Sequence, residues 1–124
     1  MNEIVNEWIV KAEADFHTAS RERAVEEWPN YDAVCFHAQQ CVEKYMKAIL
    51  IAKEVTPPRT HDLVELHRLI TEHFEEWDWP IEELRLLSRA AVHFRYPGES
   101  AGEDEAGLAF DICGKLRPVL REML

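Results

Sequence analysis

Hydrophobic residues recur every three or four positions along most of the chain, the spacing that places them on one face of an α-helix. The first such stretch covers about residues 3–26, and its apolar face is formed by Ile4, Trp8, Ala12, Phe16 and Ala19. The second stretch runs from about residue 31 to residue 53, with Asn30 as its cap. Pro29 separates the two, because proline cannot continue a helix. No segment alternates apolar and polar residues for long enough to predict a strand.

Three shorter helices are predicted after these. Thr60 is placed to cap a third helix over residues 61–74, and Pro80 suits the first turn of a fourth helix over residues 80–94. Ser100 followed by Glu103 forms a capping-box pattern that opens a fifth helix, in which Pro118 should cause a kink or mark the last turns. The pattern therefore predicts an all-α fold, a single-domain bundle (residues 1–124) of four to five helices with two long antiparallel helices.

The second helix carries two apolar faces and one polar strip. The stretch FHAQQCVEKYMKAIL, residues 36–50, places His37, Gln40, Lys44 and Lys47 on one side. One interpretation is a solvated face, in which the Lys stems cover apolar neighbours. The other is the border of a polar groove that holds an anion or a partner protein. Two apolar faces indicate that this helix packs against more than one neighbour.

The charge balance narrows the classes of function. The net charge is −10, which argues against a broad nucleic-acid-binding surface, because phosphate contacts need clustered Lys and Arg. Residues 31–60 are slightly positive, however, so a local anion site stays open there. The acidic start MNEIVNEW is unlike a secretion signal, and no run approaches the ~20 apolar residues of a membrane span. We therefore expect a cytoplasmic protein, in which three reduced cysteines are small buried residues.

Metal and cofactor chemistry finds no support in the residue spacing. A di-iron bundle needs Glu-x-x-His on facing helices, and neither this pattern nor His-Glu-x-x-His occurs. The four glycines do not form a phosphate-binding loop between a strand and a helix. We predict neither a metal nor a cofactor.

Three ordered blocks resemble the HEPN domain family: FHAQQCVEKYMKAIL, then PPRTHDLVEL, then HFRYPGE. The resemblance covers nearly the whole chain. It implies a compact helical bundle, commonly a homodimer, often encoded beside a minimal nucleotidyltransferase and acting with it as a toxin–antitoxin pair. Many members of the wider family are metal-independent RNases, whereas others bind nucleotides or act as non-catalytic partners.

The RNase branch of that family uses an Arg and a His with four to six residues between them. The matching Arg is Arg95, but the positions of the His hold Ser100, Ala101 and Gly102. None of these side chains acts as a general base near neutral pH. The resemblance therefore favours a non-catalytic nucleotide- or RNA-binding module that works with a nucleotidyltransferase.

Six residues are candidates for binding a nucleotide or another anion: His37, Lys44, Lys47, His61, Arg95 and Tyr96. Arg95 and Tyr96 are interpreted either as a cationic and stacking pair or as residues that close the fourth helix and pack. His61 either helps to hold an anion at a helix start or bonds across to the second helix. Two other functions stay open: an RNase that uses Arg95 with His93 or His61 as its base, and a purely structural bundle that dimerises.

Overall fold

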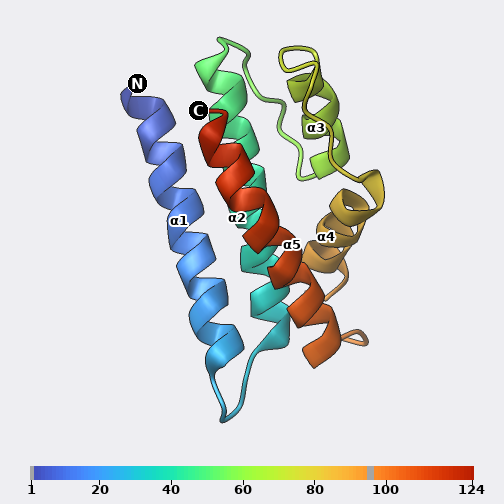
Figure 1. The fold of residues 1–124 in the computed structure, drawn as a ribbon. Coiled ribbons are helices and arrows are strands. Elements are labelled where there is room, and N and C mark those ends of the chain that lie inside the picture. The colour runs from blue at the N-terminus through green and yellow to red at the C-terminus, as the bar shows by residue number, and fades with distance from the viewer. Residues whose placement is uncertain (1, 95–96) are drawn as a thin grey trace.

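The chain is described by a computed structural model that covers residues 2–94 and 97–124. It contains five helices, shown in Figure 1, and no strand within these residues. The helices are α1 (Glu3–Ala24), α2 (Tyr31–Ala52), α3 (Leu63–Thr71), α4 (Ile81–His93) and α5 (Glu103–Glu122). The predicted all-α fold is confirmed.

The two long helices α1 and α2 run antiparallel, and α2 is the central helix of the bundle (Figure 1). It packs against α1, α3, α4 and α5, which explains why the sequence gives it two apolar faces. Large side chains of α2 that are fully buried include Tyr45, Met46, Ile49 and Leu50. Both ends of the chain lie at the same end of the bundle, opposite the turn that joins α1 to α2.

The start of α2 agrees with the sequence prediction, and the start of α3 does not. The Asn30 side chain accepts the N–H of Ala33 at 3.0 Å and caps α2. For α3 the cap is Asp62, whose Oδ1 accepts the N–H of Val64 at 3.0 Å. Thr60 instead accepts the N–H of Asp62 at 3.1 Å, so it forms a short turn before the helix. The acidic side chain takes the capping position because it sits nearer the free N–H groups and their positive dipole.

The predicted start of α5 is also displaced. Its first flanking residue is Gly102 rather than Ser100, and the N–H of Gly102 donates to Glu105 Oε2 at 3.0 Å. The returning Glu of the capping motif is therefore Glu105, three residues after Gly102. The helix continues through Pro118 to Glu122.

The turn between α1 and α2 exposes an aromatic side chain. Trp28 has a backbone φ of 55°, in the left-handed region that a residue with a Cβ rarely adopts, and it is 95% exposed. The turn is held by Glu22, whose Oε1 accepts the N–H of Asn30 at 2.7 Å. Glu26 and Glu27 beside Trp28 are also exposed.

Through a hydrogen bond, a histidine side chain stabilises the acidic segment that connects α3 to α4. His67 is buried, and its Nε2 accepts the N–H of Trp79 at 3.2 Å. Burial lowers the pKa of His67, although Asp78 Oδ1 at 3.3 Å from the same nitrogen acts in the opposite direction. The neutral imidazole is the form that can accept this hydrogen bond.

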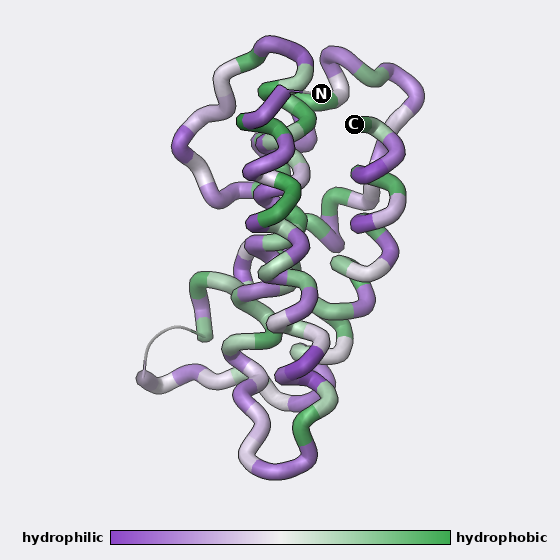
Figure 2. The backbone as a smooth tube through the Cα atoms, turned by 90° about the vertical axis from the view of Figure 1, so that its left-hand side faces the viewer, coloured by the Kyte–Doolittle hydropathy of each residue, from purple (hydrophilic) through white to green (hydrophobic). Residues whose placement is uncertain are grey.

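Hydrophilic and hydrophobic residues alternate along each helix in Figure 2. Among the helices of residues 2–94 and 97–124, none is long and apolar enough to cross a membrane. The three cysteines are buried, as predicted.

Candidate functional site

Two of the predicted anion-binding residues contact a carboxylate of the protein itself. His37 Nδ1 lies 2.7 Å from Asp15 Oδ1, and Lys44 Nζ lies 2.6 Å from Asp15 Oδ2. Asp15 belongs to α1 and is buried, while His37 and Lys44 are half-buried between the helices. These contacts join α1 to α2 through charge-assisted hydrogen bonds.

A second carboxylate, Glu43, contacts the other two predicted residues of this region. Glu43 is only 3% exposed and accepts hydrogen bonds from Lys47 Nζ at 3.0 Å and Gln39 Nε2 at 3.0 Å. His61 Nδ1 lies 2.9 Å from it. Burial alone would raise the pKa of Glu43, but the hydrogen bonds from Gln39, His61 and Lys47 outweigh burial and lower it. Lys47 is buried and the other three residues of the strip are half-buried, so the strip is only partly solvated.

A third carboxylate links α1 to the end of the chain. Glu13 accepts hydrogen bonds from Arg117 Nε at 2.7 Å and from the Tyr45 hydroxyl at 2.5 Å. The Arg117 hydrogen bond is the largest cause that lowers the pKa of Glu13 to about 2, against the opposing effect of burial. Asp15 and Glu43 neutralise most of the cations that α2 presents, and Glu13 does the same for Arg117. Cations that are freer to meet a ligand lie elsewhere on the bundle.

Helix α4 carries a row of cationic side chains that the sequence analysis did not select. Arg85, Arg89 and His93 are four residues apart, so they lie along one side of the helix. Arg85 pairs with Glu82 at 3.0 Å, and His93 Nδ1 lies 3.1 Å from Glu99 Oε2. Arg89 forms no ion pair within residues 2–94 and 97–124.

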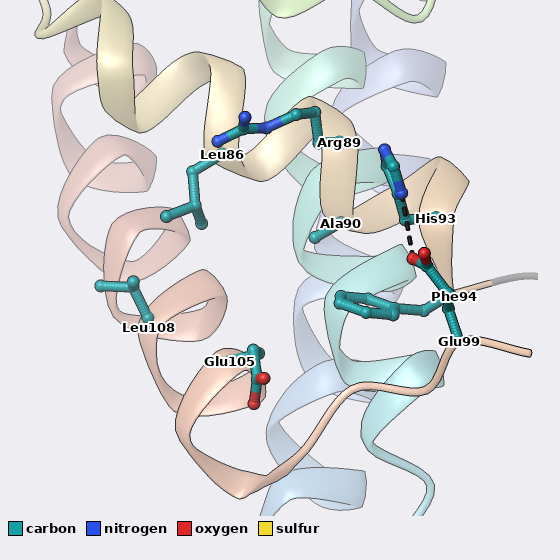
Figure 3. Close-up of a pocket in the computed structure, with 8 residues that line it drawn as sticks. All are labelled: Leu86, Arg89, Ala90, His93, Phe94, Glu99, Glu105 and Leu108. Carbon is teal, nitrogen blue, oxygen red and sulfur yellow. Dashed lines mark hydrogen bonds and ion pairs between the residues drawn. The ribbon is translucent and has the colours of Figure 1, made fainter.

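On one side of this row lies the α4–α5 cavity, which has a volume of about 320 Å³. Its lining consists of Leu86, Arg89, Ala90, His93, Phe94, Glu99, Glu105 and Leu108. Figure 3 shows the Arg89 side chain extending across the cavity from α4, with Leu108 and Glu105 on the facing helix α5 and the Phe94 ring at the other end. The cavity thus combines an apolar wall, an aromatic ring, a guanidinium group and two carboxylates, of which Glu99 pairs with His93 and Glu105 accepts the N–H of Gly102.

On the other side lies the α3–α4 groove, with a volume of about 430 Å³. It is lined by His61, Asp62, Arg85, Ser88, Arg89, Val92 and His93. The structure therefore brings His61, one of the predicted residues, to the row on α4. His37, Lys44 and Lys47 are held in the two clusters around Asp15 and Glu43.

Arg95 and Tyr96 lie outside the described residues. In the sequence they directly follow Phe94, which lines the α4–α5 cavity. Local positive charge was considered in residues 31–60 and not in residues 84–95, so Arg85 and Arg89 were not selected from the sequence. Their spacing of four residues, continued by His93, was the available signal. No group of three His, Cys, Asp or Glu side chains within the described part of the chain is arranged to hold a metal ion.

Comparison with known proteins decides the family. The model of the HEPN domain family matches residues 5–123. The chain belongs to the HEPN domain family. No curated protein matches this HEPN domain at a significant level.

Two solved structures resemble the HEPN domain over its whole length. TT1696 from Thermus thermophilus is 24% identical, with all of both chains covered and a TM-score of 0.80. ST0689, described as an archaeal HEPN homologue, is 20% identical, with 98% of each chain covered and a TM-score of 0.69. At these identities the likeness shows the fold.

Proposed function

We propose that this HEPN domain is a non-catalytic, cytoplasmic module that binds a nucleotide or RNA and acts with a minimal nucleotidyltransferase as a toxin–antitoxin-like pair. The observation that carries the binding proposal is the α4–α5 cavity, where Arg89, His93 and Phe94 surround an apolar hollow beside the sequence position of Arg95. A base can stack on an aromatic ring while a phosphate pairs with a guanidinium group. The resemblance to paired HEPN proteins supports the partner and a homodimer.

The absence of catalysis is proposed from the sequence around Arg95. Ser100, Ala101 and Gly102 occupy the positions at which the RNase branch has its His. Gly102 precedes α5 and Glu105 accepts its N–H, so this segment is used to start a helix. A binding module needs Arg95 only as a cation, which fits the residues that are present.

The binding proposal is tested with ATP and with a fluorescein-labelled single-stranded RNA, by calorimetry and fluorescence anisotropy. Arg89→Gln is expected to weaken binding roughly tenfold or more, because it removes a charge-assisted hydrogen bond. Leu108→Asn should weaken it about fivefold through loss of apolar contact. Arg68→Gln on α3 and Val10→Asn on α1 introduce the same residue types at exposed positions and should leave the affinity unchanged.

Two results would contradict the binding proposal. One is the failure of both probes to bind wild-type protein, which would favour the purely structural bundle. The other is equal affinity of the Leu108→Asn and Val10→Asn variants. The partner proposal is tested separately, by co-elution of this HEPN domain with a nucleotidyltransferase encoded beside it. Separate elution at micromolar concentration would contradict that part.

One contact favours the RNase alternative. His93 lies 3.1 Å from Glu99 and two residues before Arg95, and a carboxylate that orients an imidazole is a common arrangement for a general base. In this alternative His93 takes the proton of the ribose 2′-hydroxyl, whose oxygen bonds to the adjacent phosphorus as the P–O5′ bond breaks. The leaving 5′-oxygen takes a proton from water, and Arg95 stabilises the phosphodiester charge. Wild-type protein should then cleave a mixed RNA pool without added metal. Arg95→Ala and His93→Gln should abolish cleavage, and His73→Gln should retain it. No cleavage by the wild type would exclude the alternative.

A further inference from the structure

The α3–α4 groove concentrates positive charge on a protein whose net charge is −10. Arg85 and Arg89 line it from the same side of α4, one helical turn apart. Arg85 has only an exposed pair with Glu82, which stabilises little, and Arg89 forms no ion pair within the described residues. The Arg85 guanidinium is thus available to a ligand in the groove, and Arg89, whose side chain Figure 3 shows over the α4–α5 cavity, lines both hollows and can serve either. Their planar N–H forks match the oxygen atoms of a phosphate group.

His61 faces this groove from the segment before α3, and a buried residue fixes its position. Its Nδ1 lies 2.9 Å from Glu43, which is 3% exposed and is itself held by Lys47 and Gln39. The imidazole is nevertheless exposed over 75% of its side chain, so Nε2 remains for a ligand. The cluster that neutralises Lys47 therefore also orients His61 toward the groove. Nδ1 donates to the Glu43 carboxylate, so Nε2 can donate to an anion when the imidazole is protonated on both nitrogens, and the ring is then already ordered for that contact.

The balance of charged and polar groups in the groove determines which ligand charge it favours. Asp62 is the one carboxylate among the described residues of the lining, and its Oδ1 already accepts the N–H of Val64. Ser88 Oγ accepts the N–H of Leu63, which leaves its hydroxyl hydrogen for an acceptor. Two guanidinium groups against one carboxylate favour a dianion over a monoanion. A phosphate monoester carries close to two negative charges at neutral pH and pyrophosphate carries more, whereas an internal phosphodiester carries a single charge.

We propose that the α3–α4 groove is a binding site for a terminal phosphate group, either a phosphate monoester or a pyrophosphate, and that Arg85, Arg89 and His61 hold it. This site goes beyond the proposed function, which places a base and its phosphate at the α4–α5 cavity, because the groove binds a phosphate end with or without a base. The two hollows share Arg89 and His93, while Arg85 and His61 belong to the groove and Leu108 belongs to the cavity.

The test measures binding of pyrophosphate, AMP and the dinucleoside monophosphate ApA to the whole chain by calorimetry. Wild-type protein should bind pyrophosphate and AMP, and bind ApA at least tenfold more weakly, roughly the effect of losing one charge-assisted contact. Arg85→Gln and His61→Gln should each weaken pyrophosphate binding about fivefold or more, and the matched variant Arg68→Gln should leave it unchanged. Asp62→Asn should strengthen it. Circular dichroism establishes that these variants, all at exposed positions, remain helical.

The Leu108→Asn variant distinguishes a nucleotide from a free phosphate compound as the ligand, and it tests the cavity proposal separately from the groove proposal. This variant should weaken AMP binding and leave pyrophosphate binding intact, so pyrophosphate binding without nucleotide binding would support the groove and contradict the cavity. The groove proposal is overturned if no phosphate compound binds, if Arg85→Gln and Arg68→Gln bind pyrophosphate equally, or if ApA binds as tightly as AMP.

Discussion

Replacement of Glu43 with Ala is expected to lower the free energy of unfolding by roughly 3–5 kcal/mol, the usual cost of removing one partner of a buried ion pair. Glu43 is the acceptor for Lys47, Gln39 and His61, and its loss leaves the Lys47 ammonium buried beside no anion of the cluster. Since small domains are stable by about 5–15 kcal/mol, such a loss removes a large share of the total stability. Urea unfolding followed by circular dichroism measures it.

The matched control replaces both members of the pair. Glu43→Leu combined with Lys47→Met removes the two charges together and should retain most of the stability, because apolar residues of similar volume can replace a buried ion pair. A loss of less than about 1 kcal/mol in Glu43→Ala would contradict the expectation. It would mean that Lys47 reaches water once its partner is removed.

The second large expected effect is a loss of folding stability at low pH, caused by protonation of Glu13. The pKa of this carboxyl is lowered from 4.5 to about 2, mainly by the hydrogen bond from Arg117. A carboxyl with a lowered pKa stabilises the folded state above its unfolded pKa, and this contribution is lost as the pH falls from about 4.5 toward 2. The shift corresponds to up to about 3 kcal/mol at neutral pH.

The measurement compares wild-type protein with Glu13→Gln by urea unfolding between about pH 7 and pH 3, a range that crosses the unfolded pKa. The variant should be less stable by about 2–3 kcal/mol at neutral pH, and the difference should shrink as the pH falls below 4.5. Glu26→Gln, at an exposed position of the α1–α2 turn, should match the wild type throughout. A difference between Glu13→Gln and wild type that does not change with pH would contradict an ionic origin.

The helices and their order were predictable because each has a strong apolar period and clear end signals. The two apolar faces of α2 correctly indicated several neighbours, which the structure identifies as the other four helices. The first residues of α3 and α5 were misplaced because Thr60 and Asp62, or Ser100 and Gly102, are competing caps only two residues apart. Local spacing alone does not decide between such alternatives.

The candidate site was less predictable, because it depends on pairings between distant segments. Nothing in the sequence states that Asp15 meets His37 and Lys44. The predicted alternative in which His61 bonds across to the second helix is confirmed by its contact with Glu43, but the sequence did not identify Glu43 as the partner. Those contacts depend on how α1 and the segment before α3 are positioned along α2 when the helices pack. Through these contacts the predicted anion-binding residues of α2 form two internal ion clusters, while His61 and His37 each also line a hollow at the surface. The row on α4 that begins at Arg85 is visible in the sequence, because residues 84–98 contain three Arg and no Asp or Glu.

The exposed Trp28 has a consequence for spectroscopy. The chain contains four tryptophans, and the other three are at least partly covered, so Trp28 is the fluorophore most open to a dissolved quencher. Glu26 and Glu27 beside it attract the caesium cation and repel the iodide anion. The ratio of fluorescence quenching by caesium to quenching by iodide therefore reports the charge around this indole. A molecule that covers the α1–α2 turn would reduce quenching by caesium. Trp28 fluorescence therefore reports binding at the end of the bundle farthest from the chain termini.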